Sequence, residues 1–214
     1  MPKNNRFTKS LAAGARKTDN HPSAHPSKVQ LRRLVMEAIG ADRARVFDAF
    51  AGSGVMYRAA WHQAGLGYVG CDLRWFRDGR LAYVADNRRV MRAIDLSSFN
   101  VFDLDAYGAP WEQALILADR REVAPGELVG IVLTDGAALN IKLGGMPKAL
   151  RQIVGLTGVP AGGSRSLHDL LDMAIAGLCR RMRCKVVRRW GASGASGAQV
   201  SYAALVLQGL PPRA

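Results

Sequence analysis

Apolar residues gather in short, nearly continuous runs along the chain, and glycines or acids interrupt them. The runs at 46–50, 67–72, 81–86, 99–104 and 128–134 predict five strands, because strands of a parallel sheet are buried on both faces and do not alternate. The segments 27–39, 55–64 and 111–121 are predicted to be helices, the first with Ser27 as its N-cap. Strands and helices therefore alternate, which is typical of a parallel α/β sheet.

The last third of the chain predicts a helix over 166–182, with Ser166 as its N-cap, and two strands over 185–190 and 200–207. A glycine-rich segment at 191–198 joins these two strands. Such a loop does not supply the helical crossover that parallel strands need, so the pair is predicted to be an antiparallel hairpin. The predicted fold class is therefore α/β: a Rossmann-like, seven-stranded, mostly parallel sheet with an antiparallel strand in a C-terminal hairpin.

Residues 1–28 differ from the rest because they mix basic, polar and proline residues without an apolar period. They predict a flexible basic N-terminal arm, and residues 29–214 predict one domain. With 49% hydrophobic residues among 214, this domain can bury a core without disulfides or metals. The three cysteines form no CxxC pair and no Cys/His cluster, which favours a reduced, cytoplasmic protein without a metal site. No apolar stretch is long enough for a signal peptide or a membrane span.

The charge of the chain indicates a class of partner. The sequence has 30 Lys and Arg residues against 17 Asp and Glu, a formal net charge of +13. The excess lies at the flanks: residues 1–33 hold eight basic side chains and one acid, and no acid follows Asp172. Clustered positive charge on both flanks favours nucleic acid as the partner, ahead of a membrane or a merely solvated surface.

The clearest local motif follows the first predicted strand. Asp48 lies near the end of an apolar run, and Gly52 and Gly54 form a Gly-x-Gly turn into the next helix. Glycine is needed there because a Cβ would keep a ligand away from the backbone amides. The second strand ends in Asp72, 18 residues after Gly54, where a carboxylate can bind both hydroxyls of a ribose.

The stretch 48–54 resembles the first cofactor motif of class I methyltransferases, which often reads D-x-F-A-G-S-G. That resemblance implies S-adenosylmethionine as the cofactor, with Asp48 facing its methionine end and Asp72 clamping its ribose. Tyr57 replaces the third glycine of G-x-G-x-x-G, which argues against a pyrophosphate cofactor such as NAD. The third strand ends in a polar pair placed to meet an adenine amino group. The predicted cofactor-binding residues are Asp48, Ala51, Gly52, Ser53, Gly54, Asp72, Leu73, Asp86 and Asn87.

The fourth strand runs into the sequence DLDAYGAPW at 103–111, and ligands of open α/β sheets lie beyond the carboxyl ends of the strands. A carboxylate there can accept N–H bonds from an exocyclic base amine, and an aromatic ring can stack on the base. The segment resembles the Asp/Asn-Pro-Pro-Tyr/Phe motif of amino-methyltransferases and, more closely, the D-L-D-P-F-G-S-P sequence of tRNA guanine N2-dimethyltransferases. That resemblance implies Asp105 as the amine-binding acid, Tyr107 as the stacking ring and Asp103 as a supporting group. Ala106 replaces the proline of that family and removes a fixed φ.

Position and charge predict further substrate contacts. One acid ends the fifth strand, beside the fourth, and a tryptophan begins the helix after the motif. The glycine-rich, basic segment 137–165 is predicted to lie over the substrate as a nucleic-acid contact or lid. The cluster at 180–189 is predicted to hold phosphates together with the arm. The predicted substrate-binding residues are Trp111, Asp135, Lys142, Arg180 and Arg181.

The resemblance covers residues 45–135, and in size the chain is similar to small single-domain rRNA guanine N2-methyltransferases. It implies methyl transfer from S-adenosylmethionine to a base amine of RNA, with guanine N2 as the first choice. One alternative is a DNA amino-methyltransferase acting on adenine N6 or cytosine N4. The other is a non-catalytic nucleic-acid-binding protein that kept this fold, and Ala106 is the residue that favours it.

Overall fold

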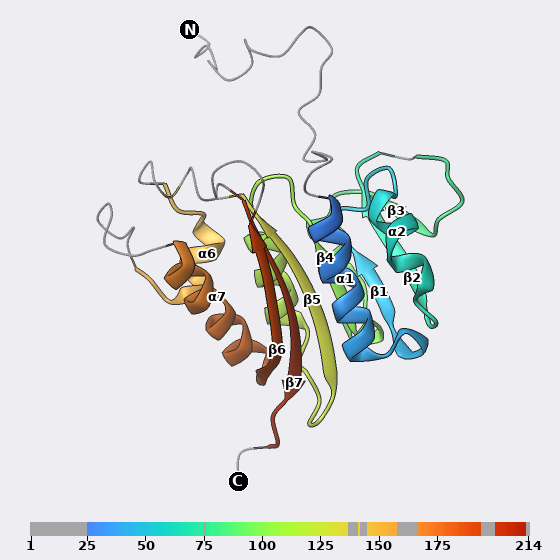
Figure 1. Ribbon diagram of the computed structural model, residues 1–214. Helices are drawn as coiled ribbons and strands as arrows, with labels where there is room; N and C mark the ends of the chain where they lie inside the picture. Colours follow the sequence, from blue (N-terminus) through green and yellow to red (C-terminus); the bar gives the residue numbers. More distant parts are fainter. Residues whose placement is uncertain are drawn as a thin grey trace, which may run out of the picture.

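The computed structural model describes residues 25–74, 76–136, 141, 145–157, 167–193 and 200–212. Seven strands form one sheet in the order β3-β2-β1-β4-β5-β7-β6 (Figure 1). The first five pair in parallel, and β7 lies antiparallel between β5 and β6. This arrangement confirms the predicted mostly parallel sheet with its antiparallel C-terminal hairpin. The strands are β1 (Arg45–Asp48), β2 (Gly67–Asp72), β3 (Ala82–Val84), β4 (Val101–Leu104), β5 (Leu128–Asp135), β6 (Cys184–Ser193) and β7 (Ser201–Gly209).

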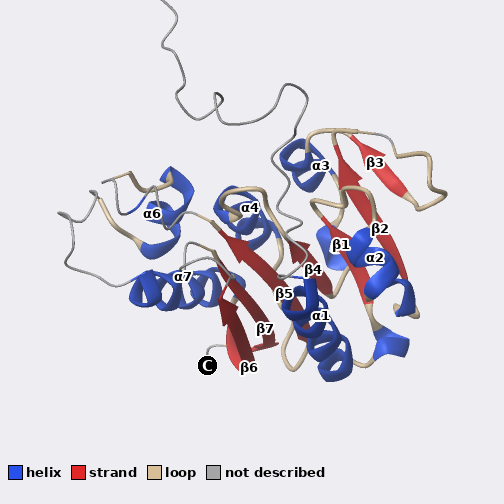
Figure 2. Ribbon diagram, turned by 45° about the horizontal axis from the view of Figure 1, so that its top comes forward, coloured by secondary structure: helices blue, strands red, loops and turns tan. Residues whose placement is uncertain are grey.

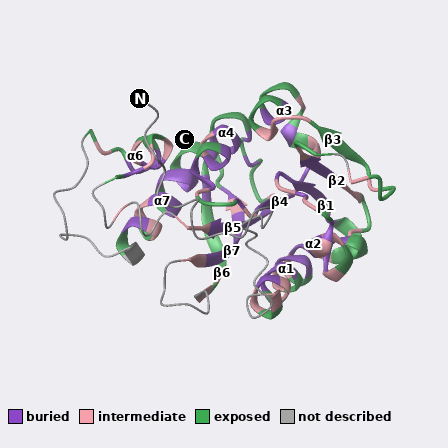
Figure 3. Ribbon diagram, turned by 90° about the horizontal axis from the view of Figure 1, so that it is seen from above, coloured by how far each residue is buried: buried purple, intermediate pink, exposed green. Residues whose placement is uncertain are grey.

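Helices cover both faces of the sheet (Figure 2). One face packs against α1 and α2, and the other against α3, α4, α6 and α7, so each face has its own apolar cluster. Figure 3 shows the buried residues concentrated along the strands and on the inward sides of the helices. Among the described helices, none is long and apolar enough to cross a membrane. In the described part of the chain, the α-helices are α1 (His25–Ile39), α2 (Val55–Ala59), α3 (Asn87–Ala93), α4 (Trp111–Arg120), α6 (Lys148–Val154) and α7 (Leu167–Met182), and short 3-10 helices span Ala41–Arg43, Trp61–Gln63 and Leu96–Ser98.

Helix α1 lies unusually close to the sheet. A Cβ on Gly130 of β5 would stand 2.4 Å from Cγ1 of Val35, so the glycine makes room for the helix. Leu31, Val35 and Ile39 are buried on the sheet side of α1, at the spacing of one helical face. This close packing sets where the first turn of α1 meets the carboxyl ends of the strands.

The first helix begins earlier than predicted. Because α1 starts at His25, Lys28 belongs to a packed helix and not to the arm. The predicted boundary at residue 28 therefore falls inside the helix, and residues 1–24 lie outside the described residues. The predicted helix over 55–64 is divided into α2 and the 3-10 turn Trp61–Gln63, because the backbone of Ala60 is not helical.

Candidate active site

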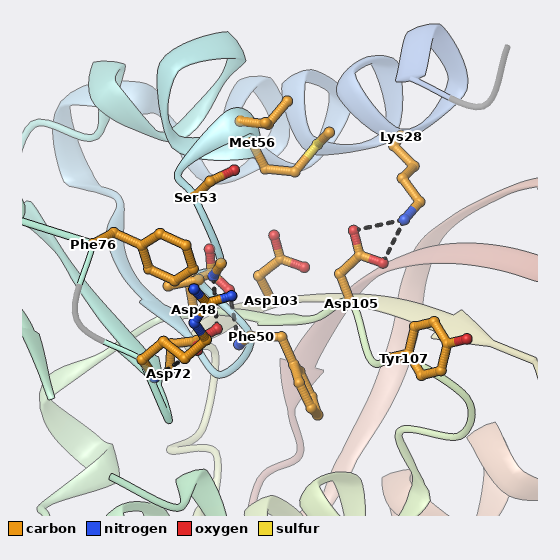
Figure 4. Close-up of a pocket in the computed structure, with 14 residues that line it drawn as sticks. Lys28, Asp48, Phe50, Ser53, Met56, Asp72, Phe76, Asp103, Asp105 and Tyr107 are labelled. Atoms are coloured by element: carbon orange, nitrogen blue, oxygen red, sulfur yellow. Dashed lines mark hydrogen bonds and ion pairs between the residues drawn. The ribbon is translucent and has the colours of Figure 1, made fainter. Parts of the chain in front are cut away.

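The carboxyl ends of β1, β2 and β4 meet at one edge of the sheet, beneath the first turn of α1. They enclose a cleft of about 430 Å³, shown in Figure 4. A second cavity of about 260 Å³ adjoins it on the side of α3, and Phe50 and Asp72 line both. The charged and aromatic residues that line the larger cleft include Lys28, Asp48, Asp72, Asp103, Asp105 and Tyr107.

The glycine turn after β1 and the acid at the end of β2 contact each other directly. Gly52 has φ 45° and its amide donates to Oδ2 of Asp72 at 3.0 Å. The other oxygen of Asp72 accepts from the amide of Arg74 at 2.9 Å. These bonds fix the carboxylate at the junction of the two cavities. The turn and the acid that the sequence predicted as one site are therefore adjacent.

Arg80 supports the glycine turn from outside, and sequence reasoning missed it. Its guanidinium donates to the carbonyl of Gly52 at 2.7 Å and to that of Ala51 at 2.9 Å. Asp78 holds the guanidinium through an ion pair. A Cβ on Gly54, whose φ is 78°, would stand 2.8 Å from this group. The second glycine is thus required by the left-handed φ and by the arginine behind it.

Asp48 is buried at the end of β1. Its oxygens accept from the amide of Phe50 at 3.0 Å and from the hydroxyl of Tyr68 at 2.9 Å. Burial, and then the negative charge of Asp103, raise the pKa of Asp48 to about 8. At neutral pH this carboxyl is therefore mainly protonated and adds little charge to the cleft.

The polar pair after β3 lies at the smaller cavity, with most of its hydrogen-bonding groups engaged. Asp86 caps α3, because its carboxylate accepts from the amide of Arg88, and it also pairs with the Arg88 guanidinium. The Asn87 side chain donates to the carbonyl of Ala49 at 2.7 Å and accepts from Gln113 at 2.9 Å. These contacts hold the start of α3 against the turn after β1. Two other predicted residues are exposed: Leu73 at the smaller cavity and Ser53 at the larger cleft.

A buried ion-pair network lies at the end of β4. Arg32 of α1 donates to both oxygens of Asp103, at 2.7 and 2.8 Å, and both side chains are 0% exposed. Trp61 adds a third bond to Asp103, at 2.6 Å from Nε1. The same guanidinium reaches Asp105 at 2.9 Å. Asp103 thus ties β4 to α1, and its role as a supporting group for Asp105 stays a prediction.

Lys28, one turn before Arg32, completes the network. Its ammonium lies 2.7 and 3.0 Å from the two oxygens of Asp105, and the lysine is 2% exposed. Burial alone would raise the pKa of Asp105, but the positive charges of Arg32 and Lys28 outweigh it and hold that pKa below its ordinary value. Sequence reasoning missed both cations. The available signal was their i, i+4 spacing in line with the apolar face of α1.

The loop after β4 presents its aromatic ring to solvent. Tyr107 is 55% exposed at the mouth of the cleft. Ala106 is buried, and its amide donates to the carbonyl of Leu104 at 2.9 Å, a bond that proline cannot make. The backbone amide of Gly136 donates to the carbonyl of Gly108 at 2.6 Å, so the ends of β4 and β5 are joined.

The predicted substrate-binding residues do not all gather here. Asp135 ends β5 next to the joined loop. Trp111 is 1% exposed in the core and does not line the cleft, which corrects its prediction as a substrate contact. Arg180 and Arg181 lie in the last turn of α7, just before β6 begins. This is the end of the sheet opposite to the cleft. Lys142 lies outside the described residues, as does most of the predicted lid at 137–165.

Arg180 and Arg181 are far from the cleft because the length of the paired strands β5, β7 and β6 separates them from it. Leu128 of β5 pairs with Gln208 near the start of β6, whereas Asp135 pairs with Ser201 at the cleft edge. Those seven residues of strand correspond to roughly 23 Å. Arg181 is also paired with Asp119 on α4. These arginines therefore lie away from the cleft, and their predicted role of holding phosphates stays a prediction.

Comparison with known proteins identifies the fold. No family model and no curated protein sequence matches the chain. Trm1 from Pyrococcus horikoshii, solved with S-adenosyl-L-methionine, superposes on 86% of the chain with a TM-score of 0.57 and 16% identity. The match covers 56% of Trm1, so the chain spans little more than half of that protein's length.

Two further structures share the arrangement. TYW2 from M. jannaschii, in complex with AdoMet, covers 92% of the chain and 80% of its own, with a TM-score of 0.57 and 8% identity. The N-methyltransferase NodS from Bradyrhizobium japonicum, in complex with S-adenosyl-L-homocysteine, covers 89% of each chain, with a TM-score of 0.52 and 12% identity. At these identities the likeness establishes the fold: a Rossmann-like α/β methyltransferase fold with its cleft at the carboxyl ends of the strands.

Proposed function

We propose that the protein is an S-adenosylmethionine-dependent N-methyltransferase that acts on a base amino group in RNA, guanine N2 first. The observation that carries this proposal is the cleft itself. It brings the glycine turn, Asp72 and the Asp105–Tyr107 loop, three separate segments of the sequence, to one edge of a methyltransferase sheet. Known structures with this fold are solved with S-adenosylmethionine or its demethylated product in place.

The residues of the cleft fit this cofactor. The two adjoining cavities suit an elongated ligand with a nucleoside at one end and a charged chain at the other, and together they reach the usual size of a ligand pocket. Asp72 would hold the ribose, because its carboxylate lies where the cavities join. The start of α3 would meet the adenine, and the turn at Gly52 and Gly54 would admit the ligand to the backbone. When bound, S-adenosylmethionine supplies an electrophilic methyl group on a sulfonium.

The protein's part in the reaction is alignment and charge. Asp105 would accept an N–H bond from the target amine and draw electron density onto the nitrogen that attacks. Tyr107, exposed at the mouth, would stack on the base. Asp103 would keep Asp105 in place through their shared partner Arg32.

The basic composition supports a nucleic-acid substrate, since 30 basic residues outnumber 17 acids. The same chemistry serves a DNA amine, adenine N6 or cytosine N4. One observation favours the non-catalytic alternative: both oxygens of Asp105 already contact cations. These alternatives make different predictions for the products.

Two measurements test the proposal. In calorimetry, S-adenosylhomocysteine should bind and NAD should not; tight NAD binding without S-adenosylhomocysteine binding would contradict the cofactor assignment. Mass spectrometry of nucleosides from cells with and without the gene should then show one methylated base lost from RNA. Loss from DNA would support the DNA alternative, and no loss from either would support the non-catalytic one.

A further inference from the structure

Among the described residues that line the cleft, Lys28 alone carries a primary amine. Figure 4 shows its side chain descending from α1 to Asp105, above Tyr107. Its ammonium donates to the same carboxylate that an incoming base amine would need. The lysine thus makes, within the protein, the contact that the proposed function assigns to the substrate.

The two cations of the network are held in different ways. Arg32 makes two bonds to Asp103, one to Asp105 and one to the carbonyl of Lys28, all of 2.7–2.9 Å, in the rigid geometry of a guanidinium. Lys28 lies in the first turn of α1, and its ammonium ends a flexible four-carbon chain. The ring of Tyr202 lies 5.5 Å from the ammonium in this position and adds a favourable contact to it. Arg32 is therefore the fixed partner of the network and Lys28 the exchangeable one.

Departure of Lys28 would leave a defined vacancy on Asp105. Oδ2 would keep its bond from Arg32 at 2.9 Å, whereas Oδ1 would lose the ammonium that contacts it at 2.7 Å. The network would also change from two cations and two carboxylates to a net charge of −1. Such a site favours an amine nitrogen on which positive charge develops.

We propose that Lys28 is the gate of the amine subsite: its ammonium occupies Asp105 in the free protein and yields that position to the exocyclic amine of the substrate base. The inference rests on the proposed function, since it assumes that the cleft receives a base amine. It explains how an acid with both oxygens engaged can still serve a substrate. Selectivity follows as well, because a base without an amine cannot replace the bonds that Lys28 gives up.

The test compares nucleotide binding by the wild type, Lys28→Met and Lys28→Arg, each saturated with S-adenosylhomocysteine. Millimolar NMR titrations would use GMP, AMP and CMP as amine-bearing probes, with IMP and UMP as controls; IMP differs from GMP only by the missing 2-amino group. If Lys28 occupies the subsite in about nine molecules of ten, its removal should tighten binding of the preferred amine-bearing nucleotide about tenfold. The affinity for IMP and UMP should increase little in Lys28→Met. Lys28→Arg should bind the amine-bearing nucleotides no more tightly than the wild type does. Arg33→Met, an exposed cation on the same helix, is the matched control and should change nothing.

A second measurement needs no substitution. In the wild type labelled with ¹⁵N-lysine, the Lys28 ammonium signal should shift or vanish when the preferred nucleotide binds. The gate would be overturned if the Lys28 signal does not change when the nucleotide binds. It would also be overturned if Lys28→Met binds GMP and IMP more tightly by the same factor, or binds neither more tightly than the wild type does. If S-adenosylhomocysteine binds but no nucleotide binds to any variant, the gate fails while the cofactor assignment stands. Failure of S-adenosylhomocysteine binding to the wild type would instead refute the proposed function.

Discussion

At the scale of single residues, three aspartates at the ends of the neighbouring strands β1 and β4 have three different environments. Asp48 accepts bonds from neutral donors, Asp103 is buried between a guanidinium and an indole, and Asp105 meets two cations at the edge of the cleft. The pKa of Asp48 is raised to about 8 and that of Asp105 is lowered. The aspartate side chain is therefore mainly neutral at position 48 and charged at position 105. Burial raises the pKa of both carboxyls, but only Asp105 has cations close enough to outweigh it.

The raised pKa of Asp48 predicts a pH-dependent loss of stability. Between about pH 4 and pH 8 the carboxyl ionises in the unfolded chain but not in the folded one, so the free energy of unfolding falls as pH rises. Asp48→Asn does not titrate, and its stability relative to the wild type should increase from pH 5 to pH 8, by at most about 1.4 kcal/mol per pH unit. Urea unfolding at several pH values measures this. If the difference in free energy of unfolding between Asp48→Asn and the wild type does not change with pH, Asp48 is ionised in the folded protein. Asp95→Asn replaces an exposed acid with a lowered pKa, so its difference from the wild type should not change over this pH range.

Asp72 is the residue whose replacement most directly tests cofactor binding. Asp72→Ala should weaken S-adenosylhomocysteine binding by roughly 1.5–3 kcal/mol, the range for hydrogen bonds to a charged group. The carboxylate also holds the amide of Gly52, so part of the loss would come from a looser turn. Calorimetry measures the change. Asp119→Ala removes an exposed acid on α4 as a control; equal affinities for all three proteins would mean that Asp72 does not bind the ligand.

Sequence patterns predicted the residues of the glycine turn and Asp72 because each lies at the end of a strand, where backbone topology alone brings them together. They did not predict Lys28 and Arg32, since their partners lie more than 70 positions away along the chain. A basic pair on an apolar helix face indicates buried acids nearby, but it does not say which ones. Trp111 was misplaced for a related reason: an aromatic residue after a motif is equally suited to the core.

At the scale of elements, the apolar strands were predictable, whereas the short helices α3 and α6 were not. The seven residues of α3 include four polar side chains, so they show no apolar period. Helix α6 does carry one, with Leu150, Ile153 and Val154 buried, but the glycines around it suggested a lid. The hairpin followed from the absence of a crossover between the last two strands, and the structure confirms it.

Because α1 packs closely on the sheet, a single methyl group added at Gly130 is predicted to lower the stability of the protein. Gly130→Ala would place a Cβ 2.4 Å from Cγ1 of Val35, so the Val35 side chain, or α1 together with it, must shift. Overpacking of this kind costs roughly 1–3 kcal/mol of stability. Because α1 carries Lys28 and Arg32, the shift should also disturb the network at Asp103. Chemical denaturation should show the loss, with Gly191→Ala, whose Cβ would lie 3.5 Å from its nearest atom, as the control; unchanged stability in Gly130→Ala would contradict the tight packing.

At the scale of the whole molecule, the positive charge is distributed over both ends of the sheet. Several C-terminal arginines have partners within the protein: Arg181 pairs with Asp119, Arg183 with Glu122 and Arg189 with Asp172. Those pairs, and their distance from the cleft, make them weaker candidates for phosphate contacts than the charge count suggested. Residues 1–24 precede α1, whose first turn lies over the cleft, so their five basic side chains are the better candidates.

Removal of residues 1–24 should therefore weaken RNA binding without harm to the fold. It deletes Lys3, Arg6, Lys9, Arg16 and Lys17 but keeps Lys28 in α1. Each lost phosphate contact should make the log–log salt dependence of binding shallower by roughly 0.7–0.9. Affinity should fall about equally for different RNA sequences, because such contacts do not read bases. Unchanged affinity and salt slope would show that the segment does not bind RNA, and thermal unfolding of both forms is the control.

The central claim is methyl transfer to a base amine at the cleft. The most direct test incubates the purified protein with unmodified RNA and S-adenosylmethionine carrying a CD₃ methyl group, followed by mass spectrometry of the nucleosides. We expect CD₃ on an exocyclic amine, with N2-methylguanosine as the first product. Asp105→Asn and Tyr107→Ala should lose most of this label while they keep affinity for S-adenosylhomocysteine, because their proposed partner is the base. Label on a ring nitrogen or ribose, or full labelling by Asp105→Asn, would contradict the claim.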